Sequence, residues 1–139
     1  MLSKLITVFT PTYNRKDTLK ECYESLLKQR NKNFRWQIID DGSTDGTEKL
    51  VDEWIGEKLI DIDYIKKRNG GKASAINFSL NNCDTLLWFC LDSDDYLFSD
   101  AIDIIVDNYK RIENNDDLCG MFGLRSNPDG SPMQNKKNT

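Results

Sequence analysis

"LLWFCLDSDDY", at residues 86–96, joins an apolar run to a cluster of carboxylates. The run is rich in aromatic and aliphatic residues, which predicts a strand. Asp92, Asp94 and Asp95 follow within four residues, and like charges at this spacing repel one another. A bound Mg²⁺ or Mn²⁺ would relieve the repulsion, because these cations prefer carboxylate oxygens. The alternative is that the carboxylates cap a helix N-terminus, where they favour the helix dipole.

The rest of the chain alternates similar strand patterns with helical ones. Strands are expected at residues 5–10, 34–40, 59–65, 85–91 and 118–124. Apolar residues at helical spacing predict helices over residues 17–30, 45–54, 72–80 and 99–112. Pro11 is expected to end the first strand, and period-two alternation places the third strand near a sheet edge. The third helix is expected to turn Ala73, Ile76 and Leu80 inward. This alternation with short connections predicts an α/β, Rossmann-like fold, a mostly parallel sheet with helices on both faces.

Length and composition fit a soluble chain. With 139 residues, 38% hydrophobic and 30% charged, we expect one domain over residues 1–125 and a polar loop or tail over residues 126–139. The net charge of −4 argues against nucleic acid as a partner, because phosphates require a basic face. The chain has no histidine and none of its four cysteines forms a C-x-x-C pair, which argues against zinc and favours reduced thiols in the cytoplasm. No apolar run reaches the roughly 20 residues of a membrane span, so membrane contact is expected to be peripheral, at the inner face.

Four polar clusters follow the expected strands at their carboxyl ends. They read "TPTYNR" (10–15), "DDGSTDGT" (40–47), "KKRNGGK" (66–72) and "DSDDY" (92–96). Because ligands of open α/β sheets bind at the carboxyl ends of the strands, the clusters predict one binding site along this side of the sheet. The first cluster lacks the G-x-G-x-x-G that a dinucleotide fold places after its first strand, which disfavours NAD.

Each of these clusters offers a ligand contact and a structural alternative. Tyr13 could stack on a planar base or pack as an aromatic at the rim. Asp40 or Asp41 could accept hydrogen bonds from a base or sugar, or could serve the turn and the next helix cap. An EF-hand-like calcium loop is disfavoured there, because the cluster follows a strand and not a helix. Lys72 opens a helix after two glycines, which suits a phosphate, or belongs to a solvated basic loop. Since Asp41 lies in a loop, we expect Asp41→Ala to leave the fold intact.

Together, in this order, the four clusters resemble the motifs of the large inverting glycosyltransferase family with the GT-A fold, often called family 2. The matching segments are "PTYNR" (11–15), "DDGSTDGT" (40–47), "NGGKASAIN" (69–77) and "DSDD" (92–95). The resemblance covers about residues 5–98. It implies the GT-A fold over the nucleotide-sugar-binding part. The activity it implies is transfer of a sugar from a nucleoside-diphosphate sugar, expected to be UDP-linked, to an acceptor hydroxyl with inversion.

The resemblance also implies roles for the residues that match its motifs. Pro11, Tyr13 and Asp41 would line the nucleoside pocket, with Asp41 facing the base and Asp40 the less favoured choice. Three further residues match the other two motifs. Lys72 would lie near the base or diphosphate, Asp92 near the ribose or metal, and Asp94 would bind Mn²⁺ or Mg²⁺.

Other implications concern parts that the motifs do not cover. Family members carry the general base in a further half, so the base is expected outside this chain, which is expected to be a truncated donor-binding part. The acceptor is expected to be a carbohydrate or a lipid-linked molecule. Pairing through an uncovered sheet edge would give a homodimer. The alternatives are a nucleotidyltransferase-like enzyme, which also uses paired aspartates and metal, and a nucleotide-binding module without turnover.

Overall fold

The structure, a computed structural model, describes residues 4–116. Within them it has four strands and four helices in alternation. They are β1 (Ile6–Thr12), α1 (Lys16–Leu27), β2 (Phe34–Asp40), α2 (Thr47–Glu57), β3 (Asp61–Lys66), α3 (Gly71–Asn81), β4 (Leu87–Cys90) and α4 (Ala101–Ile112). The chain divides into two compact units, Met1–Ile105 and Val106–Thr139. The expected fifth strand at 118–124, the tail and the domain boundary at residue 125 lie outside the described residues.

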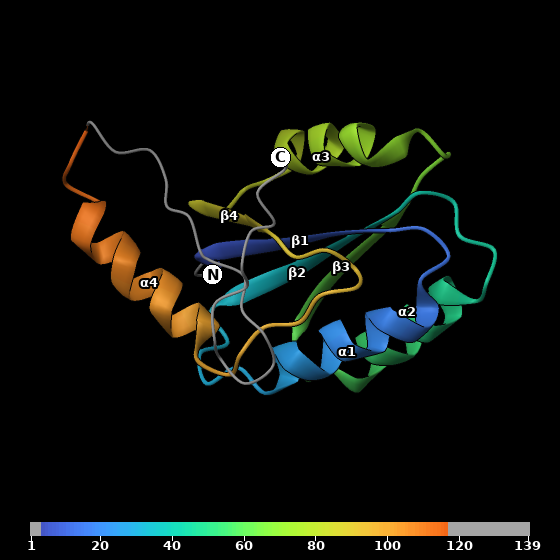
Figure 1. Ribbon diagram of the computed structural model, residues 1–139, viewed down its shortest axis with the longest axis horizontal. Coiled ribbons are helices and arrows are strands. Elements are labelled where there is room, and N and C mark those ends of the chain that lie inside the picture. The colour runs from blue at the N-terminus through green and yellow to red at the C-terminus, as the bar shows by residue number, and fades with distance from the viewer. Residues whose placement is uncertain (1–3, 117–139) are drawn as a thin grey trace, which may run out of the picture. The chain divides into compact units, whose positions relative to one another are not determined.

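The four strands of the first unit form one parallel sheet in the order β3-β2-β1-β4. In register, Ile6 of β1 lies opposite Phe34 of β2 and Leu87 of β4. Figure 1 shows α1 and α2 on one face of this sheet and α3 on the other. The predicted parallel α/β fold with helices on both faces is therefore confirmed, as is the position of β3 at an edge.

Both faces of the sheet are packed with aromatic and aliphatic side chains. On the face covered by α3, Phe9, Ile39 and Ala75 form a buried cluster, and Trp88 stacks on Phe9 with ring centroids 5.5 Å apart. A second stack joins Tyr23 of α1, Trp54 of α2 and Trp36 of β2. At roughly 1.5–3 kcal/mol for each large side chain that is fully buried, these layers hold the strands rigidly. The loops at the strand ends therefore start from fixed positions.

Helix α3 turns a different face to the sheet than its apolar residues predict. Ala75 and Ser79 are buried, Ile76 is half-buried, and Ala73 and Leu80 are exposed. The reason is a polar contact inside the core: Ser79 Oγ accepts a hydrogen bond from the Trp88 indole at 2.9 Å and pairs with Gln37. A buried hydroxyl with partners costs little, so a serine occupies a position that the pattern assigns to an apolar residue.

Pro11 does not end the first strand, and this expectation was wrong. Strand β1 continues to Thr12, with Pro11 opposite Ile39 of β2. In a parallel strand, alternate residues bond to opposite neighbours. The carbonyl of Phe9 accepts from Leu91, so Pro11 also faces the β4 side, where pairing has already ended at Cys90. Proline is tolerated because no ladder bond requires its missing N–H.

Candidate functional site

A cavity of about 400 Å³ lies at the carboxyl ends of β1, β2 and β4. Its volume falls within the range of small-ligand sites. Six of the seven residues that the sequence predicts for the site line it. The lining comprises Pro11, Thr12, Tyr13, Arg15, Asp41, Gly71, Lys72, Ala75, Asp92, Ser93 and Asp94. The predicted meeting of polar strand ends therefore occurs in one place, with Asp40 excluded from the lining.

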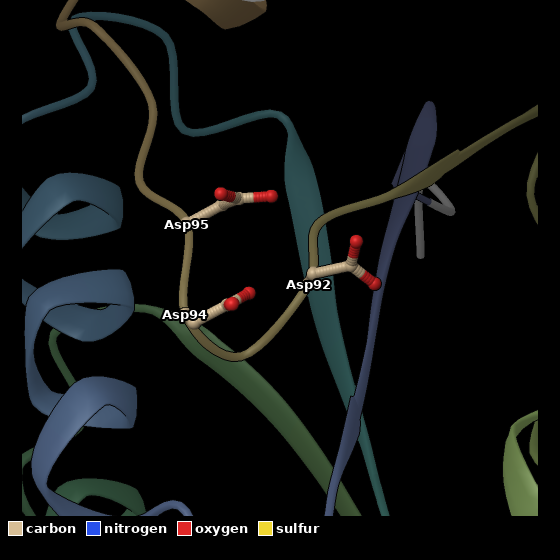
Figure 2. Close-up of side chains that lie close together, drawn as sticks. All are labelled: Asp92, Asp94 and Asp95. Carbon is tan, nitrogen blue, oxygen red and sulfur yellow. The ribbon is translucent and has the colours of Figure 1, made fainter. Parts of the chain in front are cut away.

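Asp92, Asp94 and Asp95 form an acidic turn immediately after β4. One carboxylate oxygen from each lies within 4.8 Å of the others. Figure 2 shows Asp94 and Asp95 extending toward Asp92, whose own carboxylate is turned to the opposite side. Three carboxylates at this separation suit a hard divalent cation, which takes oxygen ligands and keeps further positions for phosphate or water. The sequence predicts Asp92 and Asp94 as ligands of a cation, and the geometry adds Asp95 as a third candidate.

The acidic turn is tied to helix α1 by a buried thiol. Cys22 Sγ donates to the carbonyl of Asp95 at 2.8 Å and lies 3.4 Å from the carbonyl of Asp92. The turn also closes on itself, because the Asp95 N–H donates to the Asp92 carbonyl at 3.0 Å. Burial, together with the nearby carboxylate of Asp95, raises the pKa of Cys22 to about 12. The thiol therefore stays protonated at neutral pH and remains a hydrogen-bond donor to the turn.

Lys72 brings a positive charge to the acidic turn. Its Nζ lies 2.7 Å from Asp92 Oδ1, and this hydrogen bond raises the pKa of Lys72 above its ordinary value. The two side chains are 56% and 36% exposed. Ion pairs that remain this wet contribute about 0–1 kcal/mol to stability. The pair therefore sets the charge of the cavity more than it stabilises the fold.

Asp41 is held much more firmly than a loop residue need be. It is 8% exposed, and its Oδ1 accepts from Lys67 Nζ and from the Gly70 N–H, both at 2.8 Å. Its Oδ2 accepts from the N–H of Gly71 at 2.9 Å, where the backbone φ of +85° suits glycine. Burial alone would raise the pKa of Asp41, but these three hydrogen bonds outweigh it and lower that pKa below 3.8. The expectation that Asp41 can be replaced without effect on the fold does not agree with these contacts.

Asp40 has a different environment from its neighbour. It is fully buried at the end of β2 and does not line the cavity. Its Oδ1 accepts from the N–H groups of Gly42 and Ser43, at 3.2 and 2.8 Å, and its Oδ2 accepts from the Tyr64 hydroxyl. These contacts shape the turn that presents Asp41. That Asp40 binds the base of the nucleotide, the less favoured alternative to Asp41, stays a prediction, and its burial away from the cavity does not support it.

The end of β1 and the loop after it supply the remaining wall of the cavity. Pro11 and Tyr13 line it, and Tyr13 is 48% exposed. Asn14 has a left-handed backbone φ of +51° and is bound to the loop after β2, because its N–H donates to Ser43 Oγ at 2.9 Å. Thr12 also lines the cavity, and its buried hydroxyl oxygen makes no hydrogen bond within the described residues.

Arg15 and Ser93 also line the cavity and were not selected from the sequence. Both lie inside the polar clusters that mark the site, "TPTYNR" and "DSDDY". Arg15 could have been selected for its charge, because it is the one cation in the cluster "TPTYNR", which follows a central strand of the sheet. No sequence pattern singles out Ser93, which is included because the turn carries it between Asp92 and Asp94.

With this geometry established, comparison with known proteins gives the family. The model of glycosyl transferase family 2 matches residues 7–137, and the chain belongs to that family. This confirms the resemblance drawn from the four motifs, and with it the class of glycosyltransferase. Among solved structures, residues 1–349 of S. aureus TarS in complex with UDP-GlcNAc match with a TM-score of 0.72 and 26% identity. That match covers 78% of this chain and 32% of the TarS chain, and it confirms the GT-A architecture.

Curated relatives include enzymes of polymer synthesis. The teichoic acid poly(glycerol phosphate) polymerase of Staphylococcus epidermidis is 35% identical over 113 residues, which are 78% of this chain and 15% of that protein. The chondroitin synthase of Escherichia coli is 32% identical over 107 residues, which are 77% of this chain and 16% of that protein. The chain thus spans about 15% of the length of such relatives. Among residues 4–116, no helix combines the length and the apolar character needed to cross a membrane.

Proposed function

We propose that this chain binds the donor of an inverting sugar transfer, a UDP-linked sugar, together with a divalent cation. The observation that carries the proposal is the composition of one cavity. An aromatic ring, a fixed carboxylate, cations and an acidic turn all line the same space, through Tyr13, Asp41, Arg15, Lys72 and Asp92. These are the groups that a base, a diphosphate and its metal require. Family membership and the UDP-GlcNAc bound to TarS support the same ligand.

The nucleoside is assigned to the side of the cavity formed by Pro11, Tyr13 and Asp41. The exposed Tyr13 ring offers a face on which a planar base can stack. Asp41 is ionised at neutral pH, since its pKa is lowered, and it can accept an N–H from the base. Its Oδ1 already accepts two hydrogen bonds, so the N–H of the base is assigned to Oδ2, which accepts one.

The diphosphate is assigned to the side that carries the acidic turn. Asp94 and Asp92 would hold Mn²⁺ or Mg²⁺, with Asp95 within reach of the same ion. When bound, the cation would supply positive charge to the departing nucleoside diphosphate. Lys72 and Arg15 line the same cavity and would neutralise the remaining phosphate charge. Cys22 keeps the turn in place through its hydrogen bonds to the backbone.

The rest of the reaction is proposed from the family. The acceptor is a hydroxyl of a carbohydrate or a lipid-linked molecule, in keeping with relatives named as a teichoic acid polymerase and a chondroitin synthase. A carboxylate general base would take the proton of that hydroxyl, and we assign this role to no described residue. The protein is placed in the cytoplasm, peripherally at the inner face of the membrane. The donor-binding domain is taken to extend over residues 1–125.

Calorimetric titration of the chain with UDP tests the proposal. With Mn²⁺ present we expect saturable binding, and with EDTA in place of Mn²⁺ at least about tenfold weaker binding, because charge-assisted contacts are lost. GDP serves as the comparison nucleotide of equal charge. Equal UDP affinity with and without EDTA would contradict the metal assignment, and absence of UDP binding under both conditions would contradict the proposal itself.

We also propose that the chain pairs with a second copy of itself along β4. Within the described residues β4 pairs with β1 alone, and Leu86, just before this strand, is 65% exposed. Unpaired strand edges and exposed apolar side chains favour association. Light scattering should therefore give twice the chain mass of 16.1 kDa. A monomer mass that persists across concentrations in the micromolar range would contradict the pairing.

A further inference from the structure

The ion pair between Lys72 and Asp92 uses an oxygen atom of the acidic turn. Lys72 Nζ lies 2.7 Å from Asp92 Oδ1, and Asp92 is one of three carboxylates whose oxygen atoms lie within 4.8 Å of one another. In Figure 2 the Asp92 carboxylate is turned away from the side to which Asp94 and Asp95 extend. Because Lys72 is bound to one oxygen of Asp92, a cation held by all three carboxylates would compete with Lys72 for this residue.

We propose that Lys72 and the divalent cation exchange at Asp92. Lys72 neutralises Asp92 while the turn is without a cation, and entry of the cation releases the ammonium group into the cavity, where it meets the diphosphate. The inference rests on the function proposed above, because it takes the acidic turn as the metal site and the cavity as the nucleotide site. It adds that Lys72 contacts Asp92 before the cation enters and the diphosphate afterwards, so that Lys72 has two successive roles.

Two lysine–aspartate pairs have their aspartate in the lining of the cavity, and they differ in a way that supports this exchange. The side chains of Lys67 and Asp41 are 16% and 11% exposed, and two backbone N–H groups also donate to Asp41. The side chains of Lys72 and Asp92 are 56% and 36% exposed, and no backbone N–H group within residues 4–116 donates to the Asp92 carboxylate. A solvent-exposed ion pair on a flexible lysine side chain breaks at a small cost in free energy, whereas a mostly buried pair with additional hydrogen bonds breaks at a larger one. Lys67 is therefore held in place beside Asp41, and Lys72, which lines the cavity, is the lysine that can move.

If Lys72 and the cation exchange at Asp92, removing the charge of Lys72 should raise the affinity for Mn²⁺ and lower the affinity for UDP. Without nucleotide, Lys72→Met should bind Mn²⁺ about three- to tenfold more tightly than the unmodified chain, because the cation no longer displaces an ammonium group. With saturating Mn²⁺, the same variant should bind UDP about five- to tenfold more weakly, because the released ammonium no longer reaches the diphosphate. A merely structural role for Lys72 would not raise the affinity for Mn²⁺.

Electron paramagnetic resonance of free Mn²⁺ measures the first effect on the full chain without any nucleotide. Lys66→Met is the matched control, since it removes the same charge from an exposed pair with Glu48 at the end of β3. Lys72→Arg keeps the charge and should bind Mn²⁺ as the unmodified chain does. Lys72 is exposed, so Lys72→Met should fold; circular dichroism checks this, and Lys72→Gln provides a second uncharged variant.

Tighter Mn²⁺ binding by Lys72→Met and not by Lys66→Met is the expected result. Unchanged or weaker Mn²⁺ binding by Lys72→Met overturns the exchange, as does an equal gain in Lys66→Met, which would be an effect of net charge. Absence of Mn²⁺ binding in every variant also overturns it. The proposed donor site is judged separately by UDP binding to the unmodified chain, so failure of the exchange and failure of the donor site give different results.

Discussion

Asp94→Asn is expected to weaken the Mn²⁺-dependent binding of UDP by about ten- to a hundredfold, which corresponds to roughly 1.5–3 kcal/mol. Asp94 is the exposed member of the acidic turn, and its oxygen lies within 4.8 Å of those of Asp92 and Asp95. The amide is nearly isosteric with the carboxylate but lacks its charge, so the cation loses a ligand while the turn keeps its shape. Calorimetry with UDP and Mn²⁺ measures the loss.

A control for this variant is Asp52→Asn, which makes the same change at an exposed position on α2. It should leave both UDP binding and the melting temperature unchanged. The melting temperature of Asp94→Asn should also be unchanged, because the residue is exposed. If Asp94→Asn binds UDP as tightly as the unmodified chain does, the acidic turn is not the metal site; the helix-cap alternative is already excluded, because α4 begins only at Ala101.

Asp41→Ala is expected to reduce the free energy of unfolding by about 2–4 kcal/mol and to weaken UDP binding as well. The substitution leaves the half-buried ammonium group of Lys67 without a carboxylate, with the Arg68 carbonyl as its remaining acceptor, and it removes the acceptor of the Gly70 and Gly71 N–H groups. Unpaired buried charges and unsatisfied donors carry penalties of this size. Denaturant unfolding monitored by circular dichroism gives the free energy, and calorimetry gives the affinity.

A double variant separates the two roles of Asp41. Adding Lys67→Met to Asp41→Ala removes the unpaired charge and should restore part of the stability, while UDP binding stays weak. The pH dependence gives a further check. Because the pKa of Asp41 is lowered on folding, its contribution is complete above the unfolded value of about 4 and is lost as pH falls through the folded pKa. Full stability of Asp41→Ala at pH 7 would contradict the contacts described for this residue.

Much of the fold follows from the sequence because its strands and helices have distinct apolar periods. The strand over Phe34–Asp40 is predicted to the residue, since its run is continuous and ends at a polar turn. The inward face of α3 is not predicted, because Ser79 is buried through partners on β2 and β4 that are distant in sequence. The effect of Pro11 on β1 also depends on a neighbouring strand. Pairing of β4 with β1 stops at Cys90, before Pro11, so the missing N–H of the proline breaks no hydrogen bond of the sheet.

Some features of the candidate site can likewise be predicted from the sequence, and others cannot. The clusters at the strand ends predict which loops meet, because parallel strands place their carboxyl ends together. They do not separate Asp40, the last residue of β2, from Asp41 in the loop that follows, because the decisive contacts come from Tyr64 and from Gly70 and Gly71, which are distant in sequence. The ion pair of Lys72 with Asp92 joins residues 20 positions apart and has no local signature.

A crystal of the chain grown with UDP and Mn²⁺, with diffraction data collected at the manganese absorption edge, tests the central claim most directly. We expect one anomalous peak among the carboxylates of Asp92, Asp94 and Asp95, with the diphosphate of UDP as a further ligand and the uracil between Tyr13 and Asp41. Lys72 should have left Asp92 for the phosphates. An anomalous peak elsewhere, or UDP bound outside this cavity, would contradict the proposed donor and metal site.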